Sequence, residues 1–218
     1  MLKSISLLFF LLSAGSAGVI EPRDGKLFLS TFDDYQVPDE RANRVDQSIG
    51  IVNGVDFTNM NYLRPVANGI NNTYAAPSSP NVAAVSSDFQ AYITVNYEGS
   101  TLAALDFQIF RWGCVVGDRI NQSDDPIEVT GIYPGCTLTL TAFKGANQVA
   151  QQTFRSTTTR QTCSNCTTVS LISSFISNQN FRKADTITFR ATFPNPVGDQ
   201  QSTAFYLDDL HMTIYPKV

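Results

Sequence analysis

The chain has 218 residues, of which 43% are hydrophobic and only 16% are charged, and its formal net charge at pH 7 is −4. This length suits a single domain, and the hydrophobic fraction is sufficient for a buried core. A mildly acidic chain without a cluster of Lys or Arg is not expected to bind nucleic acid or an anionic membrane surface.

The N-terminus has the composition of a secretory signal. One lysine is followed by an apolar stretch from Ile5 to Leu12 and then by small residues. This order predicts a signal peptide over residues 1–17, since the apolar stretch is too short to span a bilayer. Cleavage there would remove Lys3 and change the formal charge from −4 to −5. We therefore expect residues 18–218 to be secreted, to an extracellular or cell-wall location, with no membrane span.

Alternating apolar and polar residues predict short β-strands along most of the chain. In chain order the expected strands are 26–32, 89–97, 102–110, 136–144, 148–156, 167–175, 185–193 and 202–215. Many short strands separated by turns indicate an all-β sandwich or barrel. An antiparallel two-sheet β-sandwich suits strands that each have one wet face.

Residues 35–86 have a different character. They contain several Asn-Gly turns and proline-rich stretches, and they read as a long irregular insertion with one or two strands near "GIVNGVDFTNM". Long loops on a rigid scaffold often carry binding function. No repeat or linker divides the chain, so we expect residues 18–218 to form one domain.

Four cysteines in a secreted chain indicate two disulfides. Their sequence permits three pairings, and we favour Cys114–Cys136, which border strands expected to be neighbours, together with Cys163–Cys166. A redox motif at Cys163–Cys166 is the alternative, but it belongs beside a βαβ unit. A zinc site is disfavoured because the chain has one C-x-x-C and one histidine.

Three Asn-X-Ser/Thr acceptors occur in predicted loops. They are Asn71, Asn121 and Asn165. In a eukaryotic host they predict N-glycosylation and agree with passage through the secretory pathway.

Two pairs of adjacent aspartates lie near the chain ends, Asp33–Asp34 after the first expected strand and Asp208–Asp209 within the last. Period-2 alternation puts Asp208 on the same face as the apolar residues that follow it. A carboxylate beside a core is costly unless it is paired or bound to a cation. If the first and last strands are adjacent, Asp33, Asp34 and Asp208 could hold a structural calcium ion, which prefers oxygen ligands.

The same pairs have a simpler explanation. A β-bulge could leave both aspartates in solvent, or a buried aspartate could accept backbone N–H bonds. The sequence leaves these alternatives open.

Several motifs carry a resemblance to known proteins: "LSTFDDY", "SSPNVAA", "FQIFRWGC" and "FYLDDLHM". They are similar to those of secreted fungal β-sandwich proteins of mostly unknown function. The layout also resembles jelly-roll carbohydrate-binding modules, in which a structural calcium lies between the first strand and an aspartate of the last. The resemblance implies a jelly-roll-like sandwich, with Asp208 and either Asp33 or Asp34 as ligands. Where the group often has a tryptophan, this chain has Phe57.

The first function hypothesis is a noncatalytic module, expected to be a monomer, that binds a glycan or a cell-wall polysaccharide. Sugar C–H faces stack on exposed aromatic rings. The candidate ligand contacts are therefore Phe57, Tyr62, Tyr74, Trp112 and Tyr133. For each of them, packing in the core is the alternative.

Two other functions compete with this hypothesis. A secreted effector or adhesin could bind a protein partner through residues 35–86. A glycoside hydrolase would need two carboxylates that flank the scissile bond, and adjacent strand residues such as Asp208 and Asp209 face opposite ways. The other acidic candidates are Asp33, Asp34, Glu98 and Glu128. The chain lacks the hydrolase motifs G-x-S-x-G and H-E-x-x-H, and its lone His211 lies in a strand, so no catalytic residue is assigned.

Overall fold

The computed structural model describes residues 25–65 except 40, 41, 43 and 45, and then residues 73–75, 80–118, 128–132, 135–156, 168–194 and 201–217. The predicted signal peptide lies outside these residues. No helix within the described ranges is long and apolar enough to cross a membrane.

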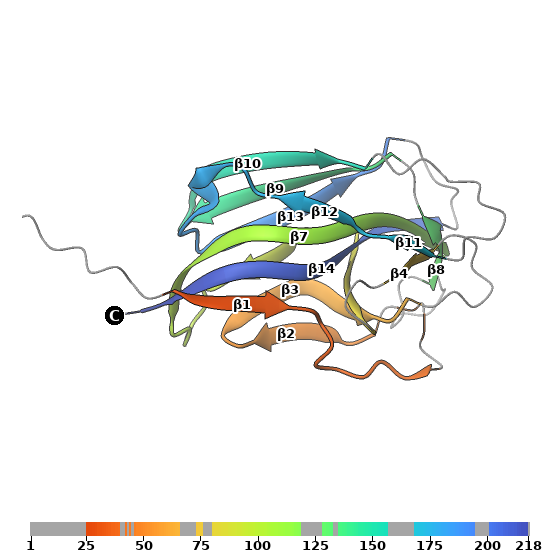
Figure 1. Ribbon diagram of the computed structural model, residues 1–218, viewed down its shortest axis with the longest axis horizontal. Coiled ribbons are helices and arrows are strands. Elements are labelled where there is room, and N and C mark those ends of the chain that lie inside the picture. Colours follow the sequence, from red (N-terminus) through yellow and green to blue (C-terminus); the bar gives the residue numbers. More distant parts are fainter. Residues whose placement is uncertain are drawn as a thin grey trace, which may run out of the picture.

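The described residues form β-strands and one 3-10 turn (Figure 1). The elements are β1 (Lys26–Ser30), β2 (Ser48–Val52), β3 (Val55–Leu63), β4 (Thr73–Ala75), β5 (Val82–Ser86), β6 (Ala91–Thr94), β7 (Leu102–Asp118), β8 (Glu128–Ile132), β9 (Thr137–Lys144), β10 (Asn147–Arg155), β11 (Thr168–Ser170), β12 (Ile172–Phe175), η2 (Gln179–Phe181), β13 (Thr186–Thr192) and β14 (Gln201–Pro216). Outside residues 35–86 most of these strands match those expected from the alternation, but β7 runs beyond the predicted 102–110, β8 was not predicted, and the predicted strand 167–175 is divided into β11 and β12.

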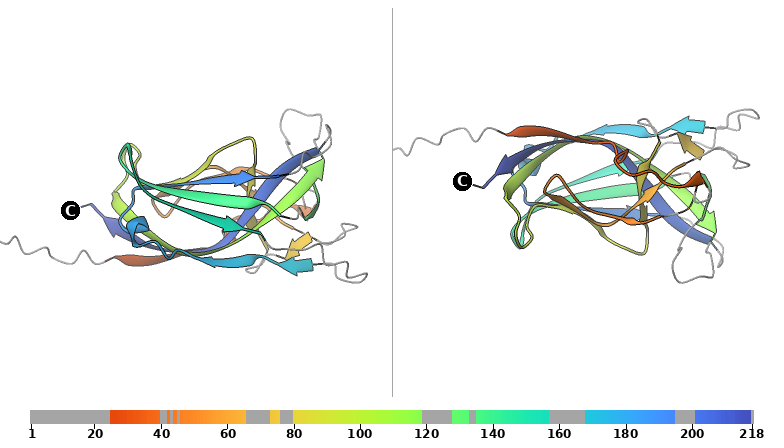
Figure 2. Two further views of the ribbon diagram at one scale, coloured as in Figure 1. Left: turned by 90° about the horizontal axis from the view of Figure 1, so that it is seen from above. Right: turned by 90° about the horizontal axis from the view of Figure 1, so that it is seen from below.

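One large antiparallel sheet dominates the fold. Its strands follow the order β10-β9-β13-β6-β3-β5-β14-β7-β12, with β1 beside β14, β2 beside β3 and β8 beside β7. The short strands β4 and β11 form a separate parallel pair. The sheet curls around the core until it nearly closes into a barrel (Figure 2). The all-β antiparallel prediction is thus confirmed, whereas the two-sheet sandwich is not.

The barrel has a seam between its two edge strands, β10 and β12, and side-chain bonds link them there. Gln152 of β10 donates from Nε2 to the carbonyl oxygen of Phe175, at 3.1 Å. Its Oε1 atom accepts the backbone N–H groups of Ser177, at 3.2 Å, and Asn178, at 3.3 Å. One amide side chain therefore fixes the segment that leaves β12 against β10.

The first and last strands lie side by side, as the sequence predicts. β1 pairs with β14 in a register from Lys26 opposite Ile214 to Ser30 opposite Leu210 (Figure 1). β5 pairs with the preceding part of β14, ending with Ala83 opposite Leu207. Since β7 occupies the other side of β14, β5 and β1 follow one another along the same side.

Residues 35–86 are not an insertion outside the sheet. They contain a β2–β3 hairpin whose turn residues, Asn53 and Gly54, have φ of 50° and 81°, as the favoured two-residue hairpin turn requires. They also contribute β5, which pairs with β3 and β14. Four of the five residues of β5, "VAAVS", are buried, so this strand lacks the alternation by which strands were predicted.

The core is rich in aromatic rings. Phe107 and Phe110 of β7 lie 5.5 Å apart between ring centroids, and Phe189 of β13 meets Phe107 edge-on at 5.7 Å. Phe154 of β10 meets Phe110 edge-on at 5.2 Å. These contacts join strands from both sides of the seam, because β7 belongs to one end of the sheet and β10 to the other.

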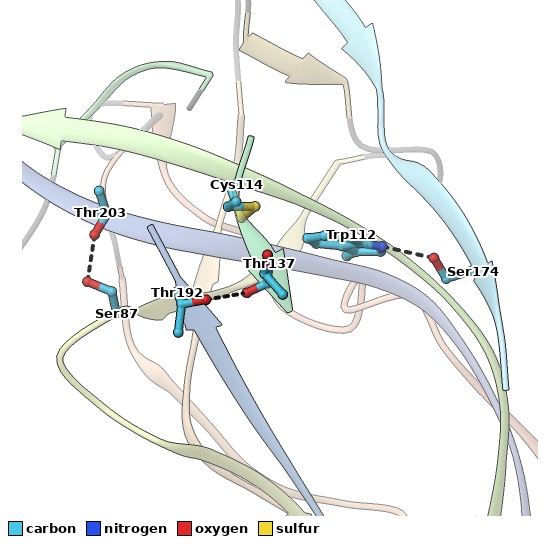
Figure 3. Close-up of a disulfide and its surroundings, with 8 residues drawn as sticks. Ser87, Trp112, Cys114, Thr137, Ser174, Thr192 and Thr203 are labelled. Carbon is cyan, nitrogen blue, oxygen red and sulfur yellow. Dashed lines mark hydrogen bonds between the residues drawn. A yellow bond between two sulfur atoms is a disulfide. The ribbon is translucent and has the colours of Figure 1, made fainter. Parts of the chain in front are cut away.

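The predicted Cys114–Cys136 disulfide is present, and both cysteines are buried (Figure 3). Its strands are not neighbours, contrary to expectation: β7 lies near one end of the sheet path and β9 near the other. The bond therefore links the two ends of the sheet across the seam. Cys163 and Cys166 lie outside the described residues.

Candidate functional site

Two of the five predicted aromatic contacts lie in the core. Trp112 of β7 is fully buried, and its indole N–H donates to the Ser174 hydroxyl at 2.9 Å (Figure 3). Phe57 of β3 is fully buried as well, and it packs edge-on against Phe32 at 5.7 Å. Neither ring presents a face to solvent, so a sugar cannot stack on it in this conformation.

A third aromatic candidate, Tyr62 of β3, is also buried. Its hydroxyl donates to Asp34 Oδ1 at 2.9 Å. Burial, together with this bond to a carboxylate, raises the pKa of Tyr62 well above its usual value. Tyr74 belongs to β4, but its side chain lies outside the described part of the molecule, as do Tyr133 and the glycosylation acceptors Asn71, Asn121 and Asn165.

Asp33 and Asp208 both belong to segments that reach the start of β5, where β1 ends and β14 passes. Asn81, just before β5, donates its backbone N–H to Asp33 Oδ1 at 3.0 Å, and its Nδ2 donates to the carbonyl oxygens of Phe32 and Tyr35. Asn81 thereby holds the turn that follows β1. The β5–β14 pairing ends with Ala83 opposite Leu207. Asp208, the next residue of β14, therefore lies near the end of β5 that Asn81 precedes.

Asp208 and Asp209 form part of a bulge in β14. Three steps along β14, from Asp208 to His211, match two steps along β7, from Arg111 to Ile109. Asp209 takes up the extra residue with φ of 47°. Its carboxylate lies 3.0 Å from Arg111 Nε, and its backbone N–H donates to Asp208 Oδ1 at 2.8 Å.

This bulge corrects the predicted faces of β14. Leu207 and Leu210 both belong to the main core, whereas Tyr206 belongs to a smaller cluster on the other side of the sheet. Strict alternation would put Leu207 and Leu210 on opposite faces, so the extra residue changes the phase between them. Asp208 therefore continues the Tyr206 side and does not share a face with Leu210. It is nevertheless 0% exposed, as a costly inward carboxylate would be.

The junction of β1, β5 and β14 supplies oxygen atoms but no compact acidic cluster. Nowhere in the described ranges do three or more His, Cys, Asp or Glu side chains gather closely enough to hold a metal ion. One further oxygen lies there: Asn81 Oδ1 is buried and accepts no hydrogen bond within the described structure. Asp34 takes no part in this arrangement, since it bonds Tyr62.

Two adjoining open pockets lie beside η2, on the seam. The first has a volume of about 330 Å³, and its lining includes Asp106, Gln108, Phe175, Asn178 and Arg182. The second has a volume of about 400 Å³ and is lined by Lys144, Val149, Gln179, Asn180, Arg182 and Lys183. The two pockets share Gln179 and Arg182, so together they form one surface, which we call the η2 groove.

Phe175 is the aromatic residue that the sequence analysis missed. It ends β12 with 66% of its surface exposed, at the rim of the first pocket. The sequence holds no signal for this exposure, because strand periodicity predicts that an aromatic residue faces the core. In β12 the pattern is inverted: the polar Ser174 is buried, since it receives the Trp112 N–H, and Phe175 is turned outward.

Hydrogen bonds fix the polar side of the η2 groove. Asp106 of β7 accepts the Tyr215 hydroxyl on Oδ2 at 2.7 Å and the Lys183 backbone N–H on Oδ1. Burial, and then the bond to Asp106, raise the pKa of Tyr215 to about 12. The η2 groove thus presents an exposed ring, amides and a guanidinium beside a carboxylate that is held at a fixed position, a combination that suits a polyhydroxylated ligand.

Comparisons with known proteins give no family. No family model matches the chain, and no curated protein matches it. Among solved structures it is similar to a DUF4465 family protein from Bacteroides caccae, with 13% identity and a TM-score of 0.42, covering 93% of this chain and 97% of that one. It is also similar to TmCBM61, solved in complex with β-1,4-galactotriose, with 10% identity and a TM-score of 0.31, covering 75% of this chain and 87% of that one.

A third similarity is to arabinose-bound MgGH51 α-L-arabinofuranosidase, with 10% identity and a TM-score of 0.27. It covers 81% of this chain but 25% of that enzyme. At these values the similarities carry no argument about function, which rests on the residues of this chain.

Proposed function

We propose that the protein is a noncatalytic glycan-binding protein and that its sugar-binding surface is the η2 groove. The observation that carries this proposal is the 66% exposed ring of Phe175 at the rim of a pocket that also presents Asp106, Gln108 and Arg182. An aromatic face stacks on the C–H face of a sugar, while carboxylate, amide and guanidinium groups bind its hydroxyls. The signal peptide predicted for residues 1–17 would bring the protein to extracellular glycans.

The rigidity of the η2 groove supports binding. Gln152 holds the backbone directly after Phe175 through its bonds to the Phe175 carbonyl and the Ser177 N–H. Asn178 Oδ1 accepts the Asn180 N–H at 3.0 Å and so fixes the start of η2. A surface that is ordered before binding loses less conformational entropy when the ligand arrives.

The carboxylates favour binding over hydrolysis. Asp106 is the one carboxylate among the described residues that line the two pockets. A glycosidase of the usual kind needs two carboxylates, one on each side of the scissile bond. Both oxygens of Asp106 also accept hydrogen bonds from the protein, which suits a fixed acceptor for sugar hydroxyls better than a proton donor.

Affinity electrophoresis of the secreted chain through gels that contain different polysaccharides tests the proposal. Phe175→Ala removes the stacking surface, and we expect it to weaken binding about 10- to 100-fold, because burying a Phe side chain contributes about 1.5–3 kcal/mol. Phe89→Ala is the matched control, since Phe89 is 57% exposed but lies outside the η2 groove. Equal binding by the parent and the Phe175→Ala variant would overturn the proposal, and so would a specific protein partner with no glycan bound.

We also propose that a calcium ion stabilises the junction of β1, β5 and β14. Asp33, Asp208 and Asn81 would supply its oxygen ligands, and the observation in favour is the buried Asn81 Oδ1 without a hydrogen-bond donor. Calcium takes carboxylate and amide oxygens, and a bound ion would compensate the burial of the Asp208 carboxylate. The ion would act on stability and not on sugar chemistry.

Thermal unfolding with calcium or with a chelator tests this second proposal. We expect millimolar calcium to raise the Tm, because a ligand that binds the folded state alone stabilises it. Asp208→Asn should abolish the shift. Asp209→Asn, whose parent carboxylate pairs with Arg111, is the control that should retain it. An identical Tm with and without calcium would contradict the calcium proposal and would not affect the proposal that the η2 groove binds a sugar.

A further inference from the structure

The second pocket of the η2 groove is cationic in a protein of net negative charge. Lys144 ends β9, and Arg182 and Lys183 follow η2; all three are exposed and line the same pocket. None of the described residues forms an ion pair with any of these three cations. No acidic residue lines this pocket, although the chain as a whole carries a formal charge of −4. Like charges brought together without a counterion repel one another, so such a group favours an anionic ligand.

Two nearby carboxylates, those of Asp106 and Asp185, each accept a backbone N–H group from the segments that carry these cations. Asp106 accepts the Lys183 N–H, which fixes Lys183 in the left-handed region with φ of 55°. Asp185 accepts the Gly145 N–H with Oδ2, which fixes the turn directly after Lys144. The backbone that carries the cations is thus held by hydrogen bonds, and the charged ends of the three side chains remain available to a ligand.

We propose that the glycan bound in the η2 groove is acidic and that its carboxylate or sulfate group binds between Lys144, Arg182 and Lys183. This inference rests on the proposed function and deepens it. The first pocket would hold a sugar ring against Phe175, and the second would hold the anionic substituent of the same chain. Arg182 lines both pockets and can bind an anionic group with two parallel N–H donors. Because the protein repels polyanions at long range, the preference depends on this short-range site.

Isothermal titration calorimetry with three galactose-based polymers tests the inference: neutral galactan, polygalacturonate and a sulfated galactan. We expect at least one acidic polymer to bind about tenfold or more tightly than the neutral one, with an affinity that falls as salt is added. The more tightly bound acidic polymer identifies carboxylate or sulfate as the group recognised. Inorganic sulfate should compete with either.

Two charge-matched variants locate the effect. The pocket variant carries Lys144→Gln and Lys183→Asn, where Asn tolerates the left-handed backbone at position 183, and it retains Arg182 because that residue also lines the first pocket. The control variant carries Lys26→Gln and Arg190→Gln, two exposed cations outside the η2 groove. We expect the pocket variant to lose the preference for the acidic polymer and to keep its affinity for neutral galactan, and the control variant to retain both.

The outcomes separate this inference from the proposed function. Equal affinities for neutral and acidic polymers, both weakened by Phe175→Ala, would overturn the acidic ligand and leave the glycan-binding proposal in place. An equal loss in the control variant would also overturn it, because the attraction would then follow overall charge. If none of the three polymers binds, the inference fails, and the proposed function must then be tested on other polysaccharides through Phe175.

Discussion

Asp106 joins three segments that are distant in sequence, because its carboxylate binds Tyr215 of β14 and the backbone of Lys183 after η2 while its own backbone belongs to β7. It therefore connects the first pocket to the strand that runs through the middle of the sheet. A residue that positions a binding surface in this way is also expected to couple stability to the protonation of its partner.

The alkaline pH dependence of stability should report that coupling. Burial and the bond to Asp106 raise the pKa of Tyr215 from its usual value of 10.0 to about 12. The folded state then retains this proton to higher pH than the unfolded state, so the free energy of unfolding should fall as pH rises from about 10 toward 12. Tyr215→Phe should reduce this fall, measured by urea unfolding at about pH 8 and about pH 11.

Part of the fall should persist in that variant, since the pKa of Tyr62 is raised as well. Tyr92→Phe, on β6, is the matched control for the loss of a tyrosine hydroxyl. Parent and Tyr215→Phe curves of equal slope would contradict the assignment.

At this scale the sequence predicted burial poorly for aromatic residues and well for one charged residue. Trp112, Phe57 and Tyr62 are candidates because they are aromatic, and all three are buried. The sequence does not distinguish the two roles, because an aromatic face can pack against a sugar or against other core side chains. Asp208 is buried as expected, although the bulge puts it on the Tyr206 side of the sheet and not on the predicted face with Leu210. The exposed Phe175 could not be found, since its orientation depends on where the Trp112 N–H finds an acceptor.

Among the elements, β14 and β7 carry paired irregularities that decide which side chains face the core. One extra residue lies in β14 near Asp209, and the register shifts again between His211 and Met212, where β7 contains the additional residue. Phe107 and Phe110 of β7 accordingly both reach the core although they are three residues apart. In this region the alternation of side chains therefore changes phase once in β14 and once in β7. The two extra residues offset each other, so the strands remain paired on both sides of the irregular region.

Substitutions at Asp209 should show how much the bulge depends on its left-handed residue. Asp209 has φ of 47°, so Asp209→Val should destabilise the protein by about 1–3 kcal/mol, because a β-branched residue is strained there. Asp209→Gly relieves the backbone and should cost less, losing mainly the partly exposed pair with Arg111. Urea unfolding of both variants measures the difference. Equal destabilisation would mean that the ion pair, and not the backbone, stabilises the bulge.

Strand positions were predictable where one face of a strand is wet, as in β9, "TLTLTAFK". They were not predictable for β5, which is buried on both faces. The bulge escaped prediction for a related reason. Alternation gives the phase of a strand only between irregularities, and two adjacent aspartates are compatible with a bulge, a buried acceptor or a metal ligand.

At the scale of the whole molecule, the Cys114–Cys136 bond closes a loop of 22 residues in sequence and links β7 to the start of β9 across the seam. Replacing both cysteines by alanine should lower the free energy of unfolding by about 3 kcal/mol, because the unfolded chain regains the entropy of that loop. Chemical denaturation of the parent, with and without reductant, and of the double variant measures the change. The prediction would be contradicted if reduction did not change the free energy of unfolding of the parent and the double variant were as stable as the parent.

The global arrangement was only partly accessible from sequence. The all-β class follows from alternation, whereas the adjacency of β1 and β14 was an expectation from the sandwich hypothesis and from the resemblance to jelly-roll modules. The order of the strands could not be predicted, because pairing between distant segments depends on how the whole sheet closes. The favoured cysteine pairing was right although its stated reason, neighbouring strands, was not.

In an almost closed barrel, local opening of the backbone costs little free energy at the two strands that lack a ladder of hydrogen bonds between them, which in the described part of the chain are β10 and β12. Within the described structure β10 pairs with β9 alone and β12 with β7 alone, so amide protons on their outer edges lack the protection that a partner strand gives. Hydrogen–deuterium exchange should accordingly be faster along these two outer edges than in strands paired on both sides, such as β13 and β14. A sugar chain bound across the two edges would slow that exchange, and the protein would be most rigid when it is carrying its ligand.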